Sequence, residues 1–332
     1  MTFSTELCLA LLLDLLLGDP PRLPHPVVGV GCLITLWEGW LCPPPQNRGQ
    51  AFLRGVALWA LVVLSTLAAV GALLCGARAS GPLFGAAATA YLLCSALAWR
   101  SLKDETLPVA LALFSGDLPA AREAVSRVVG RDTASLDEAG VVRAAVETVA
   151  ENSVDGVLSV LFWAALGQAL AGEWGMVLFV WIFKAASTMD SMVGYNDERY
   201  HDFGRFAARM DDLLNFIPAR LGGLVILAAG ACLGMDIRGG VRAFLRDRKK
   251  HKSPNSAHGE SAFAGLLGLS LGGGAEYGGV FEERPWLGDG ERTPRPADIL
   301  RAHKLLDASC ALFALLALFA QLLPLCVRTV MS

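Results

Sequence analysis

Three apolar runs of membrane-spanning length constrain this chain most strongly. Residues 51–75, 82–99 and 308–327 each approach the roughly 20 apolar residues that an α-helix needs to cross a bilayer. The 332 residues are 54% hydrophobic and only 18% charged, whereas soluble domains carry about 25% charged residues. The sequence therefore predicts an all-α, polytopic integral membrane protein, with residues 1–332 forming one membrane-embedded domain that carries long polar helical loops.

Four shorter apolar runs accompany these candidate spans. Residues 157–171 and 174–186 are separated only by Gly172-Glu173, which predicts either a tight helical hairpin or two tilted spans. Residues 5–17 and 221–235 are short for a crossing and are expected to be re-entrant or interfacial. Alternation of apolar and polar residues never persists for more than a few positions, so no strands are expected.

The distribution of Lys and Arg predicts which side of the membrane each loop faces. The links 76–81 and 172–173 are short and nearly free of basic residues, and longer polar segments alternate with them. By the positive-inside tendency, these longer segments face the cytoplasm of a cell with the protein in its inner membrane. They are residues 18–50, 100–156, 187–220 and 236–307. A complete crossing by residues 221–235 would leave the basic segment 236–307 outside, so we expect no crossing there.

Composition excludes several other classes of protein. The net charge of −3 gives no indication of a nucleic-acid partner. The eight cysteines are scattered, without a C-x-x-C pair or a Cys/His cluster, and are expected to be free, buried and apolar in character. The N-terminal apolar run lacks the basic start and small-residue cleavage site of a signal peptide, so no cleavage is expected.

An acidic stripe precedes one apolar run. Glu147, Glu151 and Asp155 are spaced four residues apart, so one face of a helix would present three carboxylates with Asn152 beside them. Like charges at this spacing repel unless a cation neutralises them, and Mg²⁺ prefers such oxygen ligands. The alternative is a solvated face or salt bridges to Arg143 and its neighbours.

A second polar stretch lies between the apolar runs 174–186 and 221–235. Asp211 and Asp212 follow Arg205 and Arg209 by one to two helical turns, which suits a grip on phosphate or equally an ordinary ion-pair ladder. Lys184 lies inside the apolar run 174–186, where an ionisable residue is a functional candidate unless it reaches the headgroups from the run's end.

Two loops complete the set of candidates. Prolines flank His25 and indicate a rigid loop that is either a turn or part of a site. His251 begins a polar loop that leads to the glycine run 272–274, whose amides would either cradle an anion or serve helix packing. No phosphate-binding glycine motif of known spacing is present, so motifs alone do not indicate a nucleotide.

Together these segments resemble the adenosylcobinamide-phosphate synthase family (CbiB/CobD) of cobalamin biosynthesis. The matching motifs occur in the family's order from the N-terminal helix to residue 289. They are Leu12-Leu13-Asp14, Gly18-Asp19-Pro20, His25-Pro26, 129–133, 146–156, 190–195, 208–212, 218–220, 253–255 with Glu260, and 285–289. The chain departs from the family's usual residues at His258, Ser270 and Arg284.

The resemblance implies a multi-pass membrane ligase. Such an enzyme joins the corrinoid carboxylate of adenosylcobyric acid to 1-amino-2-propanol O-phosphate or ethanolamine phosphate, with ATP and Mg²⁺, and gives adenosylcobinamide phosphate. Its expected partners are these substrates and the lipid bilayer, and the resemblance leaves open contacts with other late enzymes of the pathway. The active site is expected to face the cytoplasm.

The resemblance also implies roles for individual residues. The expected metal ligands are Glu147, Glu151, Asp155, Asp211 and Asp212. The expected catalytic residues are Lys184, Asp190, Tyr195, His251 and Glu260. Substrate and phosphate binding is expected of Asp14, Asp19, His25, Arg131, Asp132, Asn152, Arg205, Arg209, Arg220, Ser253 and Asn255.

Two other classes of function compete with this interpretation. A transporter or sensor with a buried polar path predicts interrupted helices in two related halves, and the sequence has no such symmetry. A metal-dependent membrane alcohol phosphotransferase predicts D-G-x-x-A-R followed by G-x-x-x-D-x-x-x-D, and that array is missing from the sequence.

Overall fold

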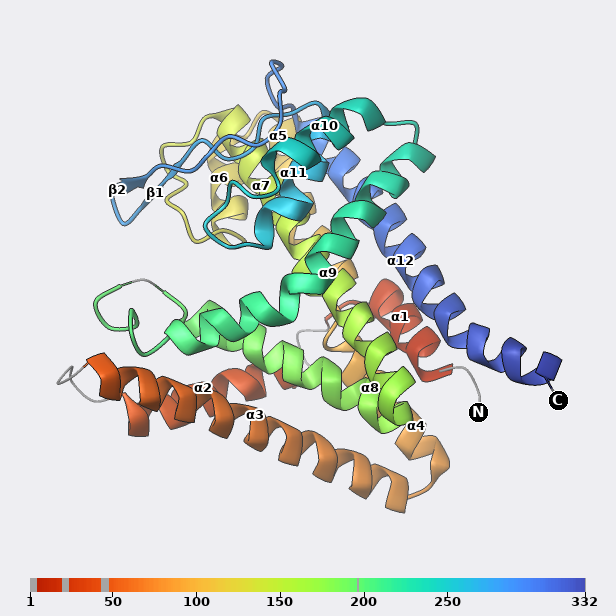
Figure 1. Ribbon diagram of the computed structural model, residues 1–332. Coiled ribbons are helices and arrows are strands. Elements are labelled where there is room, and N and C mark those ends of the chain that lie inside the picture. The colour runs from red at the N-terminus through yellow and green to blue at the C-terminus, as the bar shows by residue number, and fades with distance from the viewer. Residues whose placement is uncertain (1–4, 20–23, 43–47, 196, 332) are drawn as a thin grey trace. The chain divides into compact units, whose positions relative to one another are not determined.

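The computed structural model describes residues 5–19, 24–42, 48–195 and 197–331, with side chains as far as Phe319. The chain divides into two compact units (Figure 1). The first unit contains Met1–Leu97, Val160–Asn215 and Ala317–Ser332, and the second contains Ala98–Ser159 and Phe216–Leu316. The prediction of one domain over the whole chain remains a prediction.

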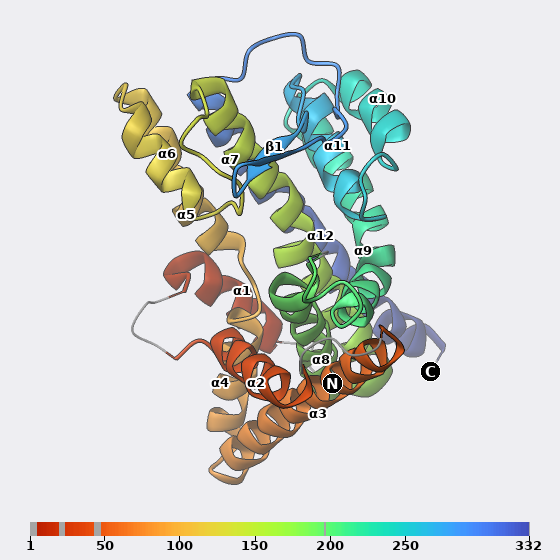
Figure 2. The same cartoon turned by 90° about the vertical axis from the view of Figure 1, so that its left-hand side faces the viewer.

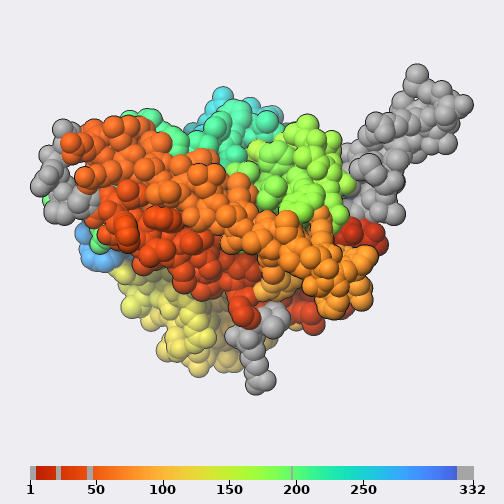
Figure 3. Space-filling model, turned by 90° about the horizontal axis from the view of Figure 1, so that it is seen from below, coloured from red at the N-terminus to blue at the C-terminus, as the bar shows by residue number. Residues whose placement is uncertain are grey.

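The first unit is built from helices. They are α1 (Thr5–Leu17), α2 (Pro26–Leu41), α3 (Arg48–Ala79), α4 (Pro82–Cys94), α8 (Ser159–Val193) and the first part of α9 (Arg205–Cys232). Helix α3 contacts both α2 and α4, and α1 packs on α4. Figure 3 shows α2 and α3 side by side on one face of this unit. Leu53 and Leu64 of α3 are largely exposed on it, as expected for a surface that faces lipid.

Helix α8 is the hairpin that the Gly172-Glu173 link predicts. Its backbone leaves the helical conformation at Ala171 and at Gly172, where φ is 64°, a value that glycine adopts without strain. The two arms approach closely, because a Cβ on Gly167 would lie 2.2 Å from the carbonyl oxygen of Gly175. The two arms are therefore packed together as a hairpin, and whether each arm crosses the membrane remains a prediction.

The two short links lie together in the first unit. Arg78, at the end of α3, forms an ion pair of 2.7 Å with Glu173 at the turn of α8. Thr89 of α4 donates a hydrogen bond of 3.0 Å to the same carboxylate, and the Arg78 guanidinium lies 4.3 Å from the Trp174 ring centre. This agrees with the expected alternation of short and long segments, although the side of the membrane that each faces remains a prediction.

Helix α2 corrects the expectation that residues 18–50 are a polar segment. It is an apolar helix of 16 residues, and Val28, Leu36 and Trp40 are 64%, 53% and 80% exposed. Helix α2 is shorter than the roughly 20 apolar residues that a crossing requires and it contains Glu38, so its sequence does not indicate a span.

The second unit surrounds a buried helix. Its elements are α5 (Trp99–Phe114), α6 (Leu118–Ser126), α7 (Glu138–Ser153), a π-helical turn η1 (Val154–Leu158), α10 (Ile237–Asp247), α11 (Ser256–Leu267), the end of α9 and the start of α12 (Pro296–Met331). Every residue of α11 from Ala257 to Leu267 is buried, and α11 lies beside both α7 and α10 (Figure 2). Asp117 and Asp137 cap α6 and α7, as the sequence indicates.

A small β-hairpin in this unit was not expected. Strands β1 (Ala275–Tyr277) and β2 (Val280–Glu282) pair antiparallel through a Gly278-Gly279 turn in which both residues have positive φ. Each strand has only three residues, too few for a visible alternation of apolar and polar positions. The turn chemistry, with two glycines, was the one available signal.

Five helical stretches of the described chain are long and apolar enough to cross a membrane. They are Arg48–Ala79, Pro82–Phe114, Glu138–Val193, Arg205–Cys232 and Pro296–Phe319. The expected helix 82–99 ends at Cys94, and a turn precedes α5, so that run is not one helix. Residues 221–235 belong largely to the 28-residue helix α9, which is longer than the apolar run suggests. That they do not complete a crossing stays a prediction.

The cysteines are free, as expected, among the residues with described side chains. Only Cys310 is buried, however, whereas Cys8, Cys32, Cys75 and Cys232 are exposed. The expectation of buried thiols is wrong for these four, because each lies on the outward apolar face of a helix instead of in a core. The side chain of Cys326 lies outside the described residues.

The closeness of the arms of α8 leads to a prediction. We expect Gly167→Ala to destabilise the protein by about 1–3 kcal/mol, because its Cβ meets a backbone oxygen that cannot move without separating the arms. Thermal unfolding of the detergent-solubilised protein measures the effect. The matched control is Gly76→Ala in α3, where a Cβ meets nothing within 4 Å. Equal melting temperatures for the two variants would contradict the close contact.

Candidate functional site

A buried ion pair between Glu147 and Arg131 is the centre of the candidate site in the second unit. Glu147 lies on α7, and the loop that precedes α7 supplies Arg131; their side chains are only 8% and 11% exposed. Burial alone would lower the pKa of Arg131, but the Glu147 carboxylate raises it above its ordinary value. The contact sets a carboxylate against a guanidinium group, so each partner offsets the cost of burying the other.

A glycine-rich segment covers this pair. The segment, here called the strap, contains residues 269–290, and its Gly272 amide donates a hydrogen bond of 2.6 Å to Glu147. Gly272, Gly273 and Gly274 all have positive φ, and a Cβ on Gly273 would lie 2.1 Å from the Trp286 ring. The glycine run thus meets an anion, as the sequence suggests, and that anion is the protein's own carboxylate.

Two further glutamates lie near the pair. Glu260 on the buried helix α11 is 7% exposed. Burial raises the pKa of Glu260 well above its usual range, and the charges of Glu151 and Glu147 raise it further. Arg284 and Arg131 oppose this rise. The Ser256 side chain hydrogen-bonds to Glu151. The second unit therefore gathers three carboxylates and two guanidinium groups in a poorly solvated place.

The residues of this cluster have the chemistry that Mg²⁺ needs but do not form a preassembled metal site. Carboxylate oxygens are its preferred protein ligands, and a buried carboxyl with a raised pKa gains most from a cation. Within the described residues, no group of three or more His, Cys, Asp or Glu side chains is arranged to hold a metal ion. Mg²⁺ typically uses one or two carboxylates and completes its shell with water and substrate phosphates, which fits these residues.

The loop between α10 and α11 places three of the expected residues together. The Ser253 amide donates to Nδ1 of His251 at 3.1 Å, and Asn255 Oδ1 accepts a hydrogen bond of 3.2 Å from Arg220 of α9. Burial lowers the pKa of His251, and the charges of Arg284 and Lys252 lower it further. His251 is therefore neutral at pH 7, and with Nδ1 accepting, its proton is on Nε2.

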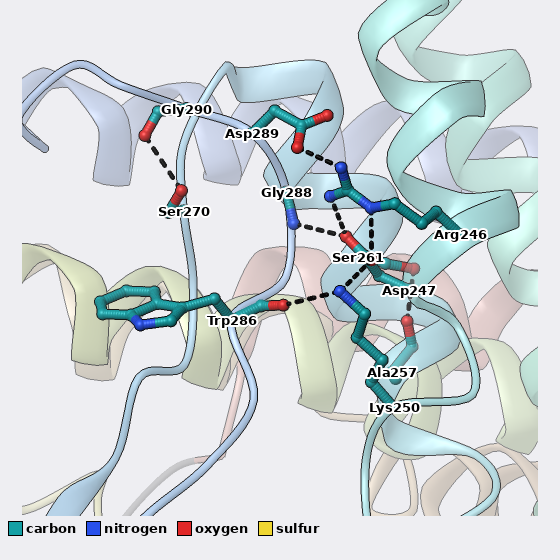
Figure 4. A network of polar contacts seen from close by, with 10 residues as sticks. All are labelled: Arg246, Asp247, Lys250, Ala257, Ser261, Ser270, Trp286, Gly288, Asp289 and Gly290. Carbon is teal, nitrogen blue, oxygen red and sulfur yellow. Dashed lines mark hydrogen bonds and ion pairs between the residues drawn. The ribbon is translucent and has the colours of Figure 1, made fainter.

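The far end of the strap is fixed by Asp247 at the end of α10 (Figure 4). This fully buried carboxylate accepts hydrogen bonds from Arg246, from Lys250 at 2.6 Å and from the Gly288 amide at 2.8 Å. Arg246 also pairs with Asp289. Burial alone would raise the pKa of Asp247, but these hydrogen bonds lower it to about 2.

The first unit contains a separate pocket with two of the expected binding residues. Asp19 follows α1 and His25 precedes α2, and Nε2 of His25 lies 3.1 Å from Oδ1 of Asp19. Both residues line the pocket together with Tyr91 and Cys94 of α4 and with Ser95, which follows α4. The Tyr91 hydroxyl donates a hydrogen bond to the Pro24 carbonyl and so holds the His25 loop against α4. The flanking prolines of His25 thus belong to a placed loop. Pro20 of the expected motif lies outside the described residues.

The other expected residues of the first unit differ in how exposed their side chains are. Lys184 and Asp190 are partly buried on the second arm of α8, whereas Tyr195 is 59% exposed beyond its end. Arg205 and Arg209 are exposed on α9, and the Asp211 carboxylate accepts from Asn215 at 3.2 Å, beside the partly buried Asp212. Gly194 leaves no room for a Cβ, which would lie 2.0 Å from Asp190 Oδ1.

Several expected residues have local structural contacts. The Asp132 carboxylate accepts a hydrogen bond of 2.8 Å from the Gly279 amide, and the Asp132 amide donates one to the Glu276 carbonyl oxygen. Asp132 therefore holds the hairpin turn. Asn152 is exposed and donates to the Thr148 carbonyl. Asp155 lies within the π-helical turn, so the α-helical spacing from Glu147 and Glu151 does not continue through it. Asp14 is fully buried on α1.

Sequence reasoning missed Arg284 and Tyr277 as site residues. The Arg284 guanidinium donates a hydrogen bond of 2.6 Å to the Tyr277 hydroxyl, and its charge acts on Glu260. Both belong to the strap, which is more than a hundred residues from Glu147 in sequence. The sequence signals for Arg284 were its place beside the Pro285-Trp286 motif and its departure from the family's usual residue.

Comparisons with known proteins agree on one family. The family model described as CobD/Cbib protein matches residues 7–306. The chain is 47% identical to the cobalamin biosynthesis protein CobD of Pelobacter propionicus, over 86% of this chain and 85% of that protein. It is 44% identical to CobD of Geobacter metallireducens and 39% identical to CbiB of Salmonella typhimurium, in both cases over 95% of this chain and 96% of the relative. No solved structure matches the chain.

The Glu147–Arg131 pair yields a stability prediction. Glu147→Gln leaves Arg131 buried without its counter-charge, and we expect a loss of about 3–5 kcal/mol. The loss is measured as a lower melting temperature and as faster proteolysis within the strap. Glu123→Gln is the matched control, because its pair with Arg127 is about 70% exposed and such pairs contribute about 0–1 kcal/mol. A double variant that adds Arg131→Met should lose less than the sum of the single losses.

Asp247 yields a prediction about pH. Its pKa is lower in the folded protein than the ordinary value of 3.8, so its stabilising effect is complete above that value. The effect is lost as the pH falls toward 2. We expect the melting temperature of Asp247→Asn to lie below that of the wild type at pH 6 to about the same extent as at pH 7. The difference should shrink below about pH 4, and a difference independent of pH would contradict this assignment.

Proposed function

Because the chain belongs to the CobD/CbiB family, we propose that it is an adenosylcobinamide-phosphate synthase. It would join the corrinoid carboxylate of adenosylcobyric acid to an amino alcohol, 1-amino-2-propanol O-phosphate or ethanolamine phosphate, through an amide bond driven by ATP. The relatives' names place them in cobalamin biosynthesis. The five helical stretches of spanning length support a multi-pass position in a membrane. We place the protein in the inner membrane, with the polar segments and the active site toward the cytoplasm, from the distribution of Lys and Arg alone.

The buried cluster of carboxylates and arginines is the observation that carries this proposal. A free carboxylate is a poor acyl donor, so the reaction needs phosphoryl transfer to it before an amine attacks, and phosphate leaves as the amide forms. Positive groups must then offset phosphate charge in a place with little water. Arg131 and Arg284 meet this need beside Glu260, and the strap excludes solvent from Glu147.

The residues of the cluster suit different parts of the reaction. Glu260, whose pKa is raised by burial and by Glu151, is poised to take a proton from the attacking ammonium group. His251 has its Nδ1 occupied by the Ser253 amide, so its Nε2–H is the group that would orient substrate. Arg220 and Asn255 form a further pair of donors and acceptors for substrate oxygens.

Metal and nucleotide binding extend the proposal. Bound Mg²⁺ would neutralise phosphate charge during the transfer. Glu151 would hold it in the second unit, together with Glu147 or Asp155 once a nucleotide is present. Asp211 and Asp212 would provide acidic ligands in the first unit, where Lys184, Arg205 and Arg209 would bind phosphates. Asp19 and His25, which line the pocket beside α4, would bind the amine end of the amino alcohol.

The proposal is tested by product formation. The purified protein is incubated with adenosylcobyric acid, aminopropanol phosphate, ATP and Mg²⁺, and mass spectrometry detects adenosylcobinamide phosphate. We expect a product that requires both ATP and the metal ion. Absence of product from folded protein, with phosphorylated and free amino alcohols both supplied, would contradict the proposal.

Carboxamide variants test the assigned residues. We expect Glu151→Gln and Asp212→Asn to reduce turnover by at least about 100-fold without lowering the melting temperature, because each removes a charge that serves catalysis. Cys8→Ala, a change at an exposed position on α1, is the control and should retain full activity. Near-normal turnover by either amide variant would refute its assignment as a metal ligand.

A further inference from the structure

Helix α10 has an exposed apolar row that the proposed function does not use. Ile237, Val241 and Leu245 are spaced four residues apart, so they align along one side of the helix. They are 36%, 39% and 59% exposed. Leu233, in the turn before α10, is also exposed.

The adjoining side of α10 packs against the rest of the second unit. Gly240, Ala243, Phe244 and Asp247 are buried. The backbones of α10 and α11 approach so closely that a Cβ on Gly265 would lie 2.4 Å from the Gly239 carbonyl oxygen. The apolar row therefore faces away from the packed core of the second unit, and rotation of α10 cannot bury it.

Basic residues flank the row. Arg238 and Arg242 are exposed, and neither forms an ion pair among the residues that the structure describes. Residues 236–252 contain seven Lys and Arg against two Asp. A helix with an apolar face bordered by arginines is typical of helices that lie in the interface of a membrane with anionic lipids.

The position of α10 in the chain supports a membrane as the occupant. Helix α9 is long and apolar enough to span a membrane and ends at Cys232, and α10 begins at Ile237. The five Cα–Cα steps from Cys232 to Ile237 reach at most about 18 Å, so α10 starts close to the depth at which α9 ends. A turn at Gly234, with φ of 67°, and the Asp236 cap start α10 directly after that end.

We propose that α10 is an interfacial helix that binds anionic phospholipid headgroups at the bilayer surface. Ile237, Val241 and Leu245 insert between the lipid chains, and Arg238 and Arg242 hold the lipid phosphates. The charge complementarity of the two arginines and the adjoining long apolar helix α9 together select a lipid surface over a protein partner. This inference is independent of the proposed enzymatic activity.

Photo-crosslinking of the full chain tests the proposal. Leu245 is replaced by p-benzoylphenylalanine, and the protein is irradiated in nanodiscs that contain phosphatidylcholine and phosphatidylglycerol. Intact-protein mass spectrometry then identifies the adducts. We expect phospholipid adducts, with phosphatidylglycerol enriched severalfold over its share of the bilayer. The double variant Arg238→Gln/Arg242→Gln should lose that enrichment and keep adducts with both lipids.

Two control positions make the result decisive. The same amino acid at Leu224, an exposed apolar position on α9, reports lipid contact, and at Ser126, the exposed end of α6, it should give no lipid adduct. Lipid adducts at position 224 but none at position 245 would overturn the proposal. So would irradiation in native membranes that yields a protein adduct at position 245 in place of lipid, or enrichment of phosphatidylglycerol that persists without the two arginines.

Discussion

The charge of Glu147 is the constraint on which the second unit depends. A carboxylate on a helix surrounded by valine and alanine cannot remain ionised in that place without compensation. Arg131 from the preceding loop supplies the opposite charge, and the Gly272 amide of the strap supplies a hydrogen bond. The distant strap is thereby joined to α7 and the preceding loop at one side chain, and Arg284 of the strap acts on the neighbouring glutamates.

The strap is held at both ends by buried carboxylates of this kind. At one end Glu147 receives Gly272, and at the other Asp247 receives Gly288. The Leu271–Leu287 bridge joins the two ends of the strap to each other, and Asp132 binds its hairpin turn. A glycine-rich segment has high conformational entropy when it is released, so these few polar contacts determine whether Tyr277, Arg284 and Trp286 stay near the site. Its backbone requires glycine where carbonyl groups and the Trp286 ring leave no room for a side chain.

Local chemistry made part of the structure predictable from the sequence. Helix caps at Asp117 and Asp137, the turn at Gly172 and the long apolar helices each follow from a few neighbouring residues. Helix α2 was missed because it contains Glu38 and is shorter than a membrane crossing, and the strand pair because three residues show no alternation. The acidic stripe drew attention to the helix that carries Glu147, but nothing near Glu147 in sequence indicates that Arg131 neutralises it or that Arg284 lies close. Such pairings depend on tertiary contacts across as many as 137 positions, the separation of Glu147 and Arg284.

The interleaving of the two units has a consequence for how the chain is made. Each unit uses segments from separated parts of the sequence, and the first also includes the end of α12. The ribosome synthesises the segments in order, so the first unit stays incomplete until the whole of the second has been synthesised. The helices of residues 5–97 must therefore persist in the bilayer before their later neighbours exist. Neither unit can be isolated by a simple truncation. A chain that stops before residue 317 lacks the last segment of the first unit, so the earliest helices are left without their full set of contacts.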